Sequence, residues 1–227
     1  MGRADTGTPQ IIISEDGSHT LYLPECDETY HSRHGAIQES KHVFIEAGLK
    51  EISLHKKNVN LLEIGFGTGL NALLSYLATQ EFDVRLHYLS LEPYPLTIET
   101  INLLNYPGLL GGNDVKFIFQ RMHNTPWDEA VLVSGDFILE KRKIQLQAFE
   151  TQIKFDLVYY DAFAPRVQPE VWTEKIFTKT FGMMSEEGVL VTYCAKGNVR
   201  RAMISSGFKV EKLNGPPGKR EMLRARK

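Results

Sequence analysis

The stretch Asn60-Leu61-Leu62-Glu63-Ile64-Gly65-Phe66-Gly67-Thr68-Gly69-Leu70-Asn71 decides the fold. The apolar residues before Gly65 predict a short buried strand, and apolar residues spaced three to four apart from Leu70 to Leu77 predict a helix. The glycines between them predict a tight turn that lets a ligand approach the backbone, with the first amides of the helix facing it. A phosphate loop is disfavoured because no Gly-Lys-Ser/Thr ending follows. The dinucleotide fingerprint is disfavoured because Leu70 stands where its third glycine belongs.

Two acidic residues follow further predicted strands. The strand that ends at Leu91 leads to Glu92, about 20 residues beyond the glycine turn, where an acidic side chain typically holds a ribose diol. The strand Phe155–Tyr160 leads to Asp161. Ligands of parallel sheets bind at the carboxyl ends of the strands, so we expect the glycine turn, Glu92 and Asp161 to share one edge. The alternative for both acids is loop capping without a ligand.

Length and composition indicate one α/β domain with a small appendage. The chain has 227 residues, of which 42% are hydrophobic and 24% charged, as in an ordinary soluble protein. Apolar runs are too short for a membrane span, and Met1–Gln10 lack a targeting segment, so the cytoplasm is expected. Cys26 and Cys194 are too few for a disulfide framework. The net charge of −2 means that a nucleic-acid partner would need a local basic face.

The N-terminal residues predict an appendage over 1–40, ahead of a main domain over 41–227. Apolar segments on either side of Asp16-Gly17 predict a β-hairpin, and Ser40 is expected to cap a helix that runs from Lys41 to about Leu54. The polar segment between them is read as a solvated loop. A metal site is the alternative, with possible ligands at Cys26, His31 and His34.

The second half of the chain continues the alternation of strands and helices. Residues 115–122 fit a helix, although alternation there leaves a strand open. The apolar runs around Ser134-Gly135-Asp136 predict a hairpin, which moves the expected adenine contact from Asp136 to Gln145. The other expected elements are a helix opened by Pro95, a helix over 172–184, a strand over 189–193, a helix ending at Gly207, and a closing antiparallel pair at 208–210 and 222–223.

The glycine turn with its acidic residue resembles the S-adenosylmethionine (SAM) loop of Rossmann-like methyltransferases. More specifically, the chain resembles the methyltransferase domain of the bifunctional tRNA 5-methylaminomethyl-2-thiouridine biosynthesis proteins, the MnmC-like family. That resemblance implies a class I α/β fold with a mostly parallel seven-stranded sheet, a C-terminal antiparallel strand pair and a small N-terminal β-hairpin. The matching stretches, in family order, are 39–44, 63–71, 91–96, 161–165, 169–173, 197–201 and 218–223.

The resemblance also implies a reaction: SAM methylates the primary amine of 5-aminomethyl-(2-thio)uridine at the tRNA wobble position, in the anticodon stem-loop. The family's flavin-dependent oxidase domain is missing, so we expect a stand-alone enzyme whose substrate comes from an upstream enzyme. Asp161 is the expected catalytic residue, orienting the amine or accepting its hydrogen. Tyr30 and Phe163 are expected to stack on the base, or else merely to pack, with Pro165 beside them. The expected SAM contacts are Glu63, Gly65, Phe66, Gly67, Thr68, Gly69, Asn71, Glu92, Pro93 and Gln145, and the expected tRNA contacts are Arg33, Lys196, Arg200, Arg201, Lys219 and Arg220.

Two other functions stay open at this point. A spermidine-synthase-like enzyme would use a small-molecule amine; it too has an Asp after the fourth strand, and the net charge of −2 suits it. A non-enzymatic module that senses SAM or binds tRNA would bind without turnover. The basic candidates for tRNA could equally be solvated surface residues.

Overall fold

The structure is a computed structural model that describes residues 8–227. The centre of its fold is an eight-stranded sheet with the strand order β10-β11-β9-β8-β4-β5-β7-β6. Neighbours from β9 to β7 run parallel, whereas β11 and β6 are each antiparallel to the strands beside them. The mostly parallel sheet and its antiparallel closing pair are therefore confirmed, with one strand more than expected. The strands are β4 (Asn58–Ile64), β5 (Arg85–Leu91), β6 (Ala130–Ser134), β7 (Phe137–Arg142), β8 (Phe155–Tyr160), β9 (Met184–Thr192), β10 (Lys209–Asn214) and β11 (Glu221–Arg226).

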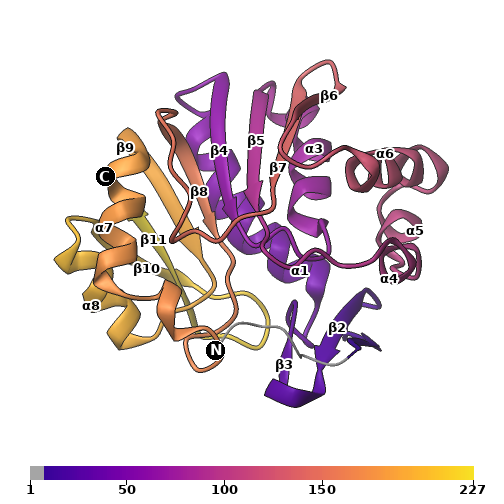
Figure 1. The fold of residues 1–227 in the computed structure, drawn as a ribbon, viewed down its shortest axis with the longest axis horizontal. Coiled ribbons are helices and arrows are strands. Elements are labelled where there is room, and N and C mark those ends of the chain that lie inside the picture. The colour runs from indigo at the N-terminus through magenta and orange to yellow at the C-terminus, as the bar shows by residue number, and fades with distance from the viewer. Residues whose placement is uncertain (1–7) are drawn as a thin grey trace.

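The sheet is buried on both faces between two layers of helices (Figure 1). Successive strand residues point to opposite faces, so Leu61 and Tyr159 pack in one core cluster while Leu62 and Tyr160 pack in the other. This explains why the central strands read as continuous apolar runs. One layer contains α3 (Leu70–Phe82), α6 (Asn113–Asn124) and the helix over 36–53, and the other contains α7 (Glu174–Met183) and α8 (Gly197–Ser205).

The N-terminal hairpin is confirmed and extended by a third short strand. β1 (Gln10–Ile13) pairs with β2 (His19–Leu23), and after the short helix η1 (Pro24–Cys26), β3 (Glu28–Thr29) pairs with β2. Figure 1 shows β2 and β3 apart from the large sheet, near α1. Residues 1–7, which belong to the predicted appendage and to the stretch without targeting features, lie outside the described residues.

The helix after the hairpin begins earlier than the sequence suggests. α1 (Ala36–Ser40), the π-helical segment η2 (Lys41–Leu49) and α2 (Lys50–Ser53) follow one another directly, and Ser40 has helical backbone angles. The prediction that Ser40 caps this helix is therefore wrong. The first amides are capped by the hairpin turn instead: Ser14, Ser18 and Asp16 accept hydrogen bonds from the N–H groups of residues 36, 37 and 38.

The remaining helices pack at the side of the sheet that carries β6 and β7 (Figure 1). α6 confirms the helical reading of residues 115–122, because Val115, Phe119 and Met122 share its buried face. None of the helices within residues 8–227 is long and apolar enough to cross a membrane. The short elements not yet given are α4 (Ile98–Asn102), α5 (Tyr106–Leu110) and η3 (Pro169–Val171).

Candidate active site

The glycine turn lies at the carboxyl end of β4 and is crowded on two sides. Gly65, Gly67 and Gly69 have φ values of +95°, +50° and +74°, which L-residues rarely adopt. A Cβ at Gly65 would lie 2.9 Å from the carbonyl oxygen of Asp161, and a Cβ at Gly69 would lie 2.7 Å from Nε2 of His123. The turn therefore needs glycine both for its backbone angles and because neighbouring atoms leave no room for a side chain.

Glu92 links the next strand to this turn. The N–H of Gly67 donates to its Oε2 at 3.0 Å, and the N–H of Tyr94 donates to its Oε1 at 2.9 Å. The carboxylate is 6% exposed, so both contacts form away from bulk solvent. Charge-assisted hydrogen bonds of this kind are among the stronger ones in proteins, and they fix Glu92 against the glycine turn.

One large pocket of about 1260 Å³ opens at the carboxyl edge of the sheet. It brings together side chains from the N-terminal sheet, the glycine turn and the loops after β5, β7 and β8, as expected for a site at the end of parallel strands. The predicted site residues that line it are Tyr30, Arg33, Gly65, Phe66, Gly67, Glu92, Pro93, Gln145, Asp161, Phe163 and Lys219.

Four of the predicted cofactor residues lie behind this pocket instead of lining it. Glu63 is fully buried in β4, where Ser90 Oγ donates to its Oε2 at 2.6 Å, and burial raises the pKa of Glu63 to about 8. Asn71 Nδ2 donates to Asp161 Oδ2 at 2.8 Å, so its role is to hold the acid of the pocket. Thr68 Oγ1 is bonded to Nε2 of His31 at 2.8 Å, and Gly69 faces α6.

Asp161 stands at the inner wall of the pocket. Burial is the main cause that raises its pKa to about 7, and the charge of Glu39 raises it further, while the Asn71 hydrogen bond and the Lys219 charge lower it. Near neutral pH the carboxyl group is therefore poised between its ionised and neutral forms. A group in that state can accept a proton from a bound ligand and pass it on.

The remaining predicted residues are not brought to this pocket. Lys196, Arg201 and Arg220 are exposed, on and beside α8 and in the loop between β10 and β11, and Arg200 is half-buried on α8. Pro165 is also outside the lining. Asp136 pairs with Arg85 at 3.2 Å at the amino end of β5, the opposite end from Glu92, which bears out the hairpin reading.

Sequence reasoning missed several residues that line the pocket, among them Glu39, Tyr193 and His31. Glu39 lies within residues 39–44, which match the resembled family, and that match is the sequence signal that could have identified it as a site residue. The sequence places His31 in a solvated loop, with a metal ligand as the alternative, and predicts neither its burial nor its bond to Thr68. Burial lowers its pKa to about 4, so its ring is neutral and serves as a hydrogen-bonding partner of Thr68.

The alternative of a metal site finds no support in the described part of the chain. His34 Nδ1 contacts Glu15 Oε1 at 2.9 Å on the surface, whereas His31 Nε2 is bonded to Thr68 Oγ1 in the interior. Within residues 8–227, no three His, Cys, Asp or Glu side chains group closely enough to hold a metal ion.

The pocket residues fit SAM on several structural grounds. The volume of the pocket, about 1260 Å³, exceeds the usual range for pockets that bind drug-sized ligands, which leaves space for a cofactor and an acceptor. Gly65 and Gly67 present bare backbone, which a side chain would cover. Glu92 offers a carboxylate of the kind that accepts hydrogen bonds from a ribose diol, and Gln145 offers an amide for the adenine amine.

Comparison with known proteins shows which families this chain is similar to. A family model described as S-adenosyl-L-methionine-dependent methyltransferase matches residues 127–227. The tRNA 5-methylaminomethyl-2-thiouridine biosynthesis bifunctional proteins MnmC of Burkholderia thailandensis and Cupriavidus metallidurans are each 31% identical to this chain. The alignments cover 94% and 95% of this chain but 34% and 33% of those proteins, so the chain spans about a third of their length.

Solved structures give the same grouping. The crystal structure of MnmC2 from Aquifex aeolicus superposes with a TM-score of 0.80 at 26% identity, covering 99% of this chain and 72% of that one. Spermidine synthase from Thermotoga maritima has a TM-score of 0.60 at 14% identity, covering 99% and 70%, which indicates a shared fold alone. By sequence and by fold, the chain is therefore similar to SAM-dependent methyltransferases: residues 127–227 match that family model, and nearly the whole chain aligns with about a third of the MnmC proteins and with the MnmC2 structure.

Proposed function

We propose that this chain transfers a methyl group from SAM to the primary amine of 5-aminomethyl-(2-thio)uridine at the tRNA wobble position, giving the 5-methylaminomethyl base. One observation carries the proposal most directly. Gly65, Gly67 and Glu92 share a pocket with Asp161, a half-buried acid whose pKa desolvation raises to about 7. Cofactor-binding groups and a proton acceptor thus lie in the same cavity, as an amine methyltransferase requires.

The cofactor would lie against the glycine turn. Glu92 would accept hydrogen bonds from the ribose hydroxyls, Gln145 would meet the adenine amine, and the backbone of Gly65 and Gly67 would face the methionine part. When bound, SAM supplies an electrophilic methyl carbon: the amine lone pair forms the new N–C bond while the S–C bond breaks and sulfur keeps the bonding electrons. The pocket residues contribute mainly placement, because an in-line displacement depends strongly on alignment.

Asp161 would act on the acceptor amine. An alkylammonium has no lone pair, so the amine must be neutral before it can attack. The ionised carboxylate accepts a hydrogen bond from the amine and takes up the proton that methylation releases, while Asn71 Nδ2 holds its Oδ2 at 2.8 Å. Because this acid titrates near neutral pH, it can return that proton to solvent after each turnover.

The base of the substrate would enter beside two aromatic rings. Tyr30 and Phe163 line the pocket and contact each other edge to face, with ring centroids 5.1 Å apart. A wobble base splayed out of the anticodon loop can stack on such a platform. Tyr30 also lies next to Gly67, since a Cβ there would come within 3.2 Å of its ring. The aromatic pair therefore places the base close to the cofactor loop.

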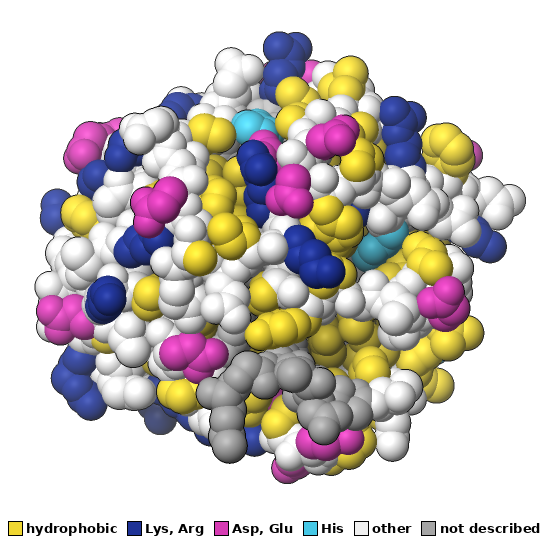
Figure 2. All heavy atoms as spheres, viewed as in Figure 1, with side chains coloured by type: hydrophobic (Ala, Val, Ile, Leu, Met, Phe, Trp, Pro, Cys, Tyr) yellow, Lys and Arg dark blue, Asp and Glu magenta, His cyan; other side chains and the backbone are white. Residues whose placement is uncertain are grey.

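The tRNA itself would be held outside the pocket. The basic residues of α8, Arg200 and Arg201, are candidates for contacts with the phosphates of the anticodon stem-loop, together with Lys196 and Arg220 and with Arg33, which lines the pocket. Basic and acidic side chains are interspersed over the face shown in Figure 2, so the contact would be local. An upstream enzyme would supply the aminomethyl base, and the reaction would take place in the cytoplasm, with the tRNA.

Labelled SAM, the full chain and tRNA that carries unmethylated 5-aminomethyl-(2-thio)uridine provide the test. Nucleoside analysis should find the label in the 5-methylaminomethyl nucleoside. Label in a small-molecule amine, with none in tRNA, would support the spermidine-synthase-like reading and overturn this one. Binding of SAM without any transfer to either acceptor would support a sensing module. The greater likeness to MnmC2 than to spermidine synthase favours the first outcome.

A further inference from the structure

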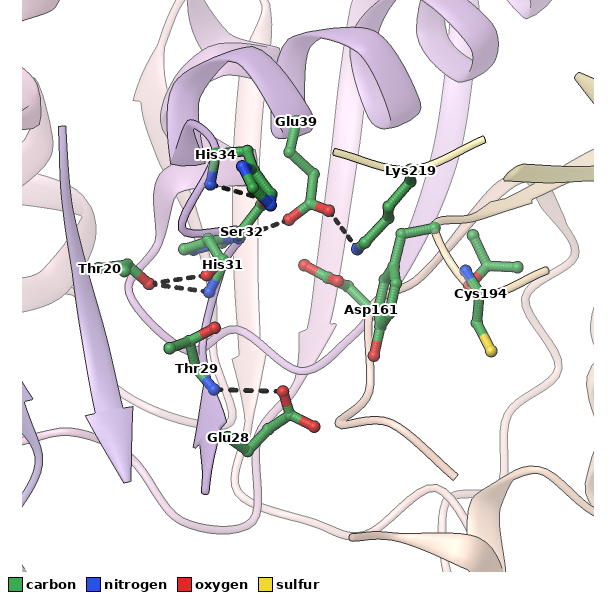
Figure 3. A network of polar contacts seen from close by, with 12 residues as sticks. Thr20, Glu28, Thr29, His31, Ser32, His34, Glu39, Asp161, Cys194 and Lys219 are labelled. Atoms are coloured by element: carbon green, nitrogen blue, oxygen red, sulfur yellow. Dashed lines mark hydrogen bonds and ion pairs between the residues drawn. The ribbon is translucent and has the colours of Figure 1, made fainter. Parts of the chain in front are cut away.

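One end of the pocket holds charged side chains from three distant segments. Glu39 belongs to α1, Asp161 follows β8, and Lys219 comes from the loop between β10 and β11. Figure 3 shows the carboxyl group of Asp161 beside the contact between Glu39 and Lys219. Glu39 is only 5% exposed and the side chain of Lys219 is 32% exposed, so the pair forms at the wall of the pocket with Lys219 partly open to solvent.

The pair is fixed from both sides. Lys219 Nζ forms an ion pair with Glu39 Oε1, and the N–H of Ser32 donates to Glu39 Oε2 at 2.7 Å. Lys219 Nζ also lies 4.0 Å from the centroid of the Tyr193 ring, a favourable position for a cation. An ammonium held by a carboxylate and an aromatic face inside a pocket is poorly placed to follow a tRNA backbone, the role expected for Lys219 from sequence.

We propose that Glu39 and Lys219 are positioning residues for the amine acceptor, a pair that places one fixed negative and one fixed positive charge beside Asp161. This inference rests on the proposed function and adds two residues to it. The cation of Lys219 disfavours a second cation nearby, so it favours the neutral, nucleophilic form of a bound primary amine. Glu39 keeps Lys219 in place and prevents its charge from holding Asp161 permanently ionised.

The electrostatics around Asp161 agree with this geometry. Burial comes first among the causes that raise the pKa of Asp161, Glu39 raises it as well, and Lys219 lowers it. The other titratable groups that interact with Asp161 are Glu63 of β4, Tyr88 of β5 and Tyr193 after β9. Tyr193 itself contacts Lys219 and is influenced by the charge of Glu39, and none of these three side chains is replaced in either variant. The two replacements should therefore move the titration of Asp161 in opposite directions.

Carbon-13 NMR of protein with labelled aspartate side chains tests this without any turnover. The Asp161 resonance is assigned by its loss in Asp161→Asn. In Glu39→Gln the titration midpoint should fall by about one pH unit, and in Lys219→Met it should rise by about one unit. The double variant should lie between them. The control variants Glu46→Gln and Lys50→Met replace an exposed 2.7 Å pair further along the same helix and should leave the midpoint unchanged.

Methyl transfer gives the second readout. The acidic limb of the kcat/KM profile should shift in the same directions as the NMR midpoints, because Asp161 must be ionised to accept a hydrogen from the amine. Lys219→Arg keeps the charge and should keep the wild-type profile. A loss of activity without a shifted profile would indicate a merely structural role.

The two proposals can fail separately. If the wild type methylates tRNA but both variants titrate like it, or shift in the same direction, the positioning role is wrong and the proposed function stands. If the midpoints move apart but no aminomethyl acceptor is methylated, the charge pair stands as an electrostatic device and its assignment to an amine acceptor is wrong. Should Lys219→Met not fold, Lys219→Gln with Glu39→Gln gives the same comparison.

Discussion

Replacing Glu92 by Gln removes a charge from the proposed cofactor site while keeping the side-chain shape. Both carboxylate oxygens accept backbone N–H groups, from Gly67 at 3.0 Å and Tyr94 at 2.9 Å. A glutamine has only one acceptor oxygen, so its NH₂ group must face one of these two donors. The variant therefore loses one bond to the loop as well as the charged acceptor proposed for the ribose.

The size of the effect follows from the strength of such bonds. A hydrogen bond to a charged group contributes about 1.5–3 kcal/mol, so loss of the charged ribose acceptor should weaken SAM binding about 10- to 150-fold. Isothermal titration calorimetry with SAM and the otherwise intact chain measures this directly. The loop contact should cost about 1–3 kcal/mol of stability, seen by urea denaturation, so both quantities are needed. Wild-type SAM affinity in a folded Glu92→Gln protein would refute the ribose assignment; Glu46→Gln, on the exposed helix surface, is the control.

Three further substitutions separate chemistry, backbone shape and protonation. Asp161→Asn should lower kcat about 10²- to 10⁴-fold with SAM affinity within about twofold of wild type, measured by single-turnover methylation and calorimetry; an unchanged kcat would contradict its role. Gly65→Ala should destabilise the protein by about 2–4 kcal/mol in urea denaturation, because the φ of Gly65 is +95° and the new Cβ would lie 2.9 Å from the Asp161 carbonyl oxygen. The control Gly108→Ala should be nearly neutral, because a Cβ there meets nothing within 4 Å. Equal effects of the two substitutions would show that the turn relaxes. Glu63 has a folded-state pKa raised from 4.5 to about 8, so its contribution to stability is complete below pH 4.5 and is lost as pH rises through 8. Glu63→Gln should remove up to about 5 kcal/mol of this decline, measured by urea denaturation at several pH values. If the free energy of unfolding falls with pH as steeply in the variant as in the wild type, Glu63 is not the cause of the decline.

The glycine turn, Glu92 and Asp161 could be assigned to the site from the sequence because each belongs to a local sequence pattern. The strand, the glycine turn and the helix follow one another in a single stretch that includes an acidic residue. Glu92 and Asp161 each come directly after a strand. The carboxyl ends of parallel strands meet at one edge, so adjacency in space follows from three separate local patterns. Gln145 could be predicted to line the same pocket because the turn around residue 135 joins two strands of a hairpin, so the loop that reaches the pocket follows the second strand.

The charge pair could not be predicted in this way. Glu39 and Lys219 are 180 residues apart, and no periodicity relates a helix residue to a loop residue at that distance. Lys219 reads in the sequence as one basic residue beside another, Arg220, and only the fold shows that the first lines a pocket and the second is exposed. The Ser40 error has the same origin, since the residues that cap the helix lie in a turn about 20 positions earlier in the chain.

These long-range contacts make the N-terminal sheet a part of the candidate active site. Its turn residue Asp16 caps the helix that carries Glu39, and the hydrogen bonds it accepts hold the pKa of Asp16 below its ordinary value although burial opposes this. Its last segment places His31 on Thr68 of the glycine turn and Tyr30 against Gly67. The predicted boundary at residue 40 falls within a helix that continues to residue 53. The hairpin therefore fixes one wall of the pocket, and the parallel sheet fixes the other.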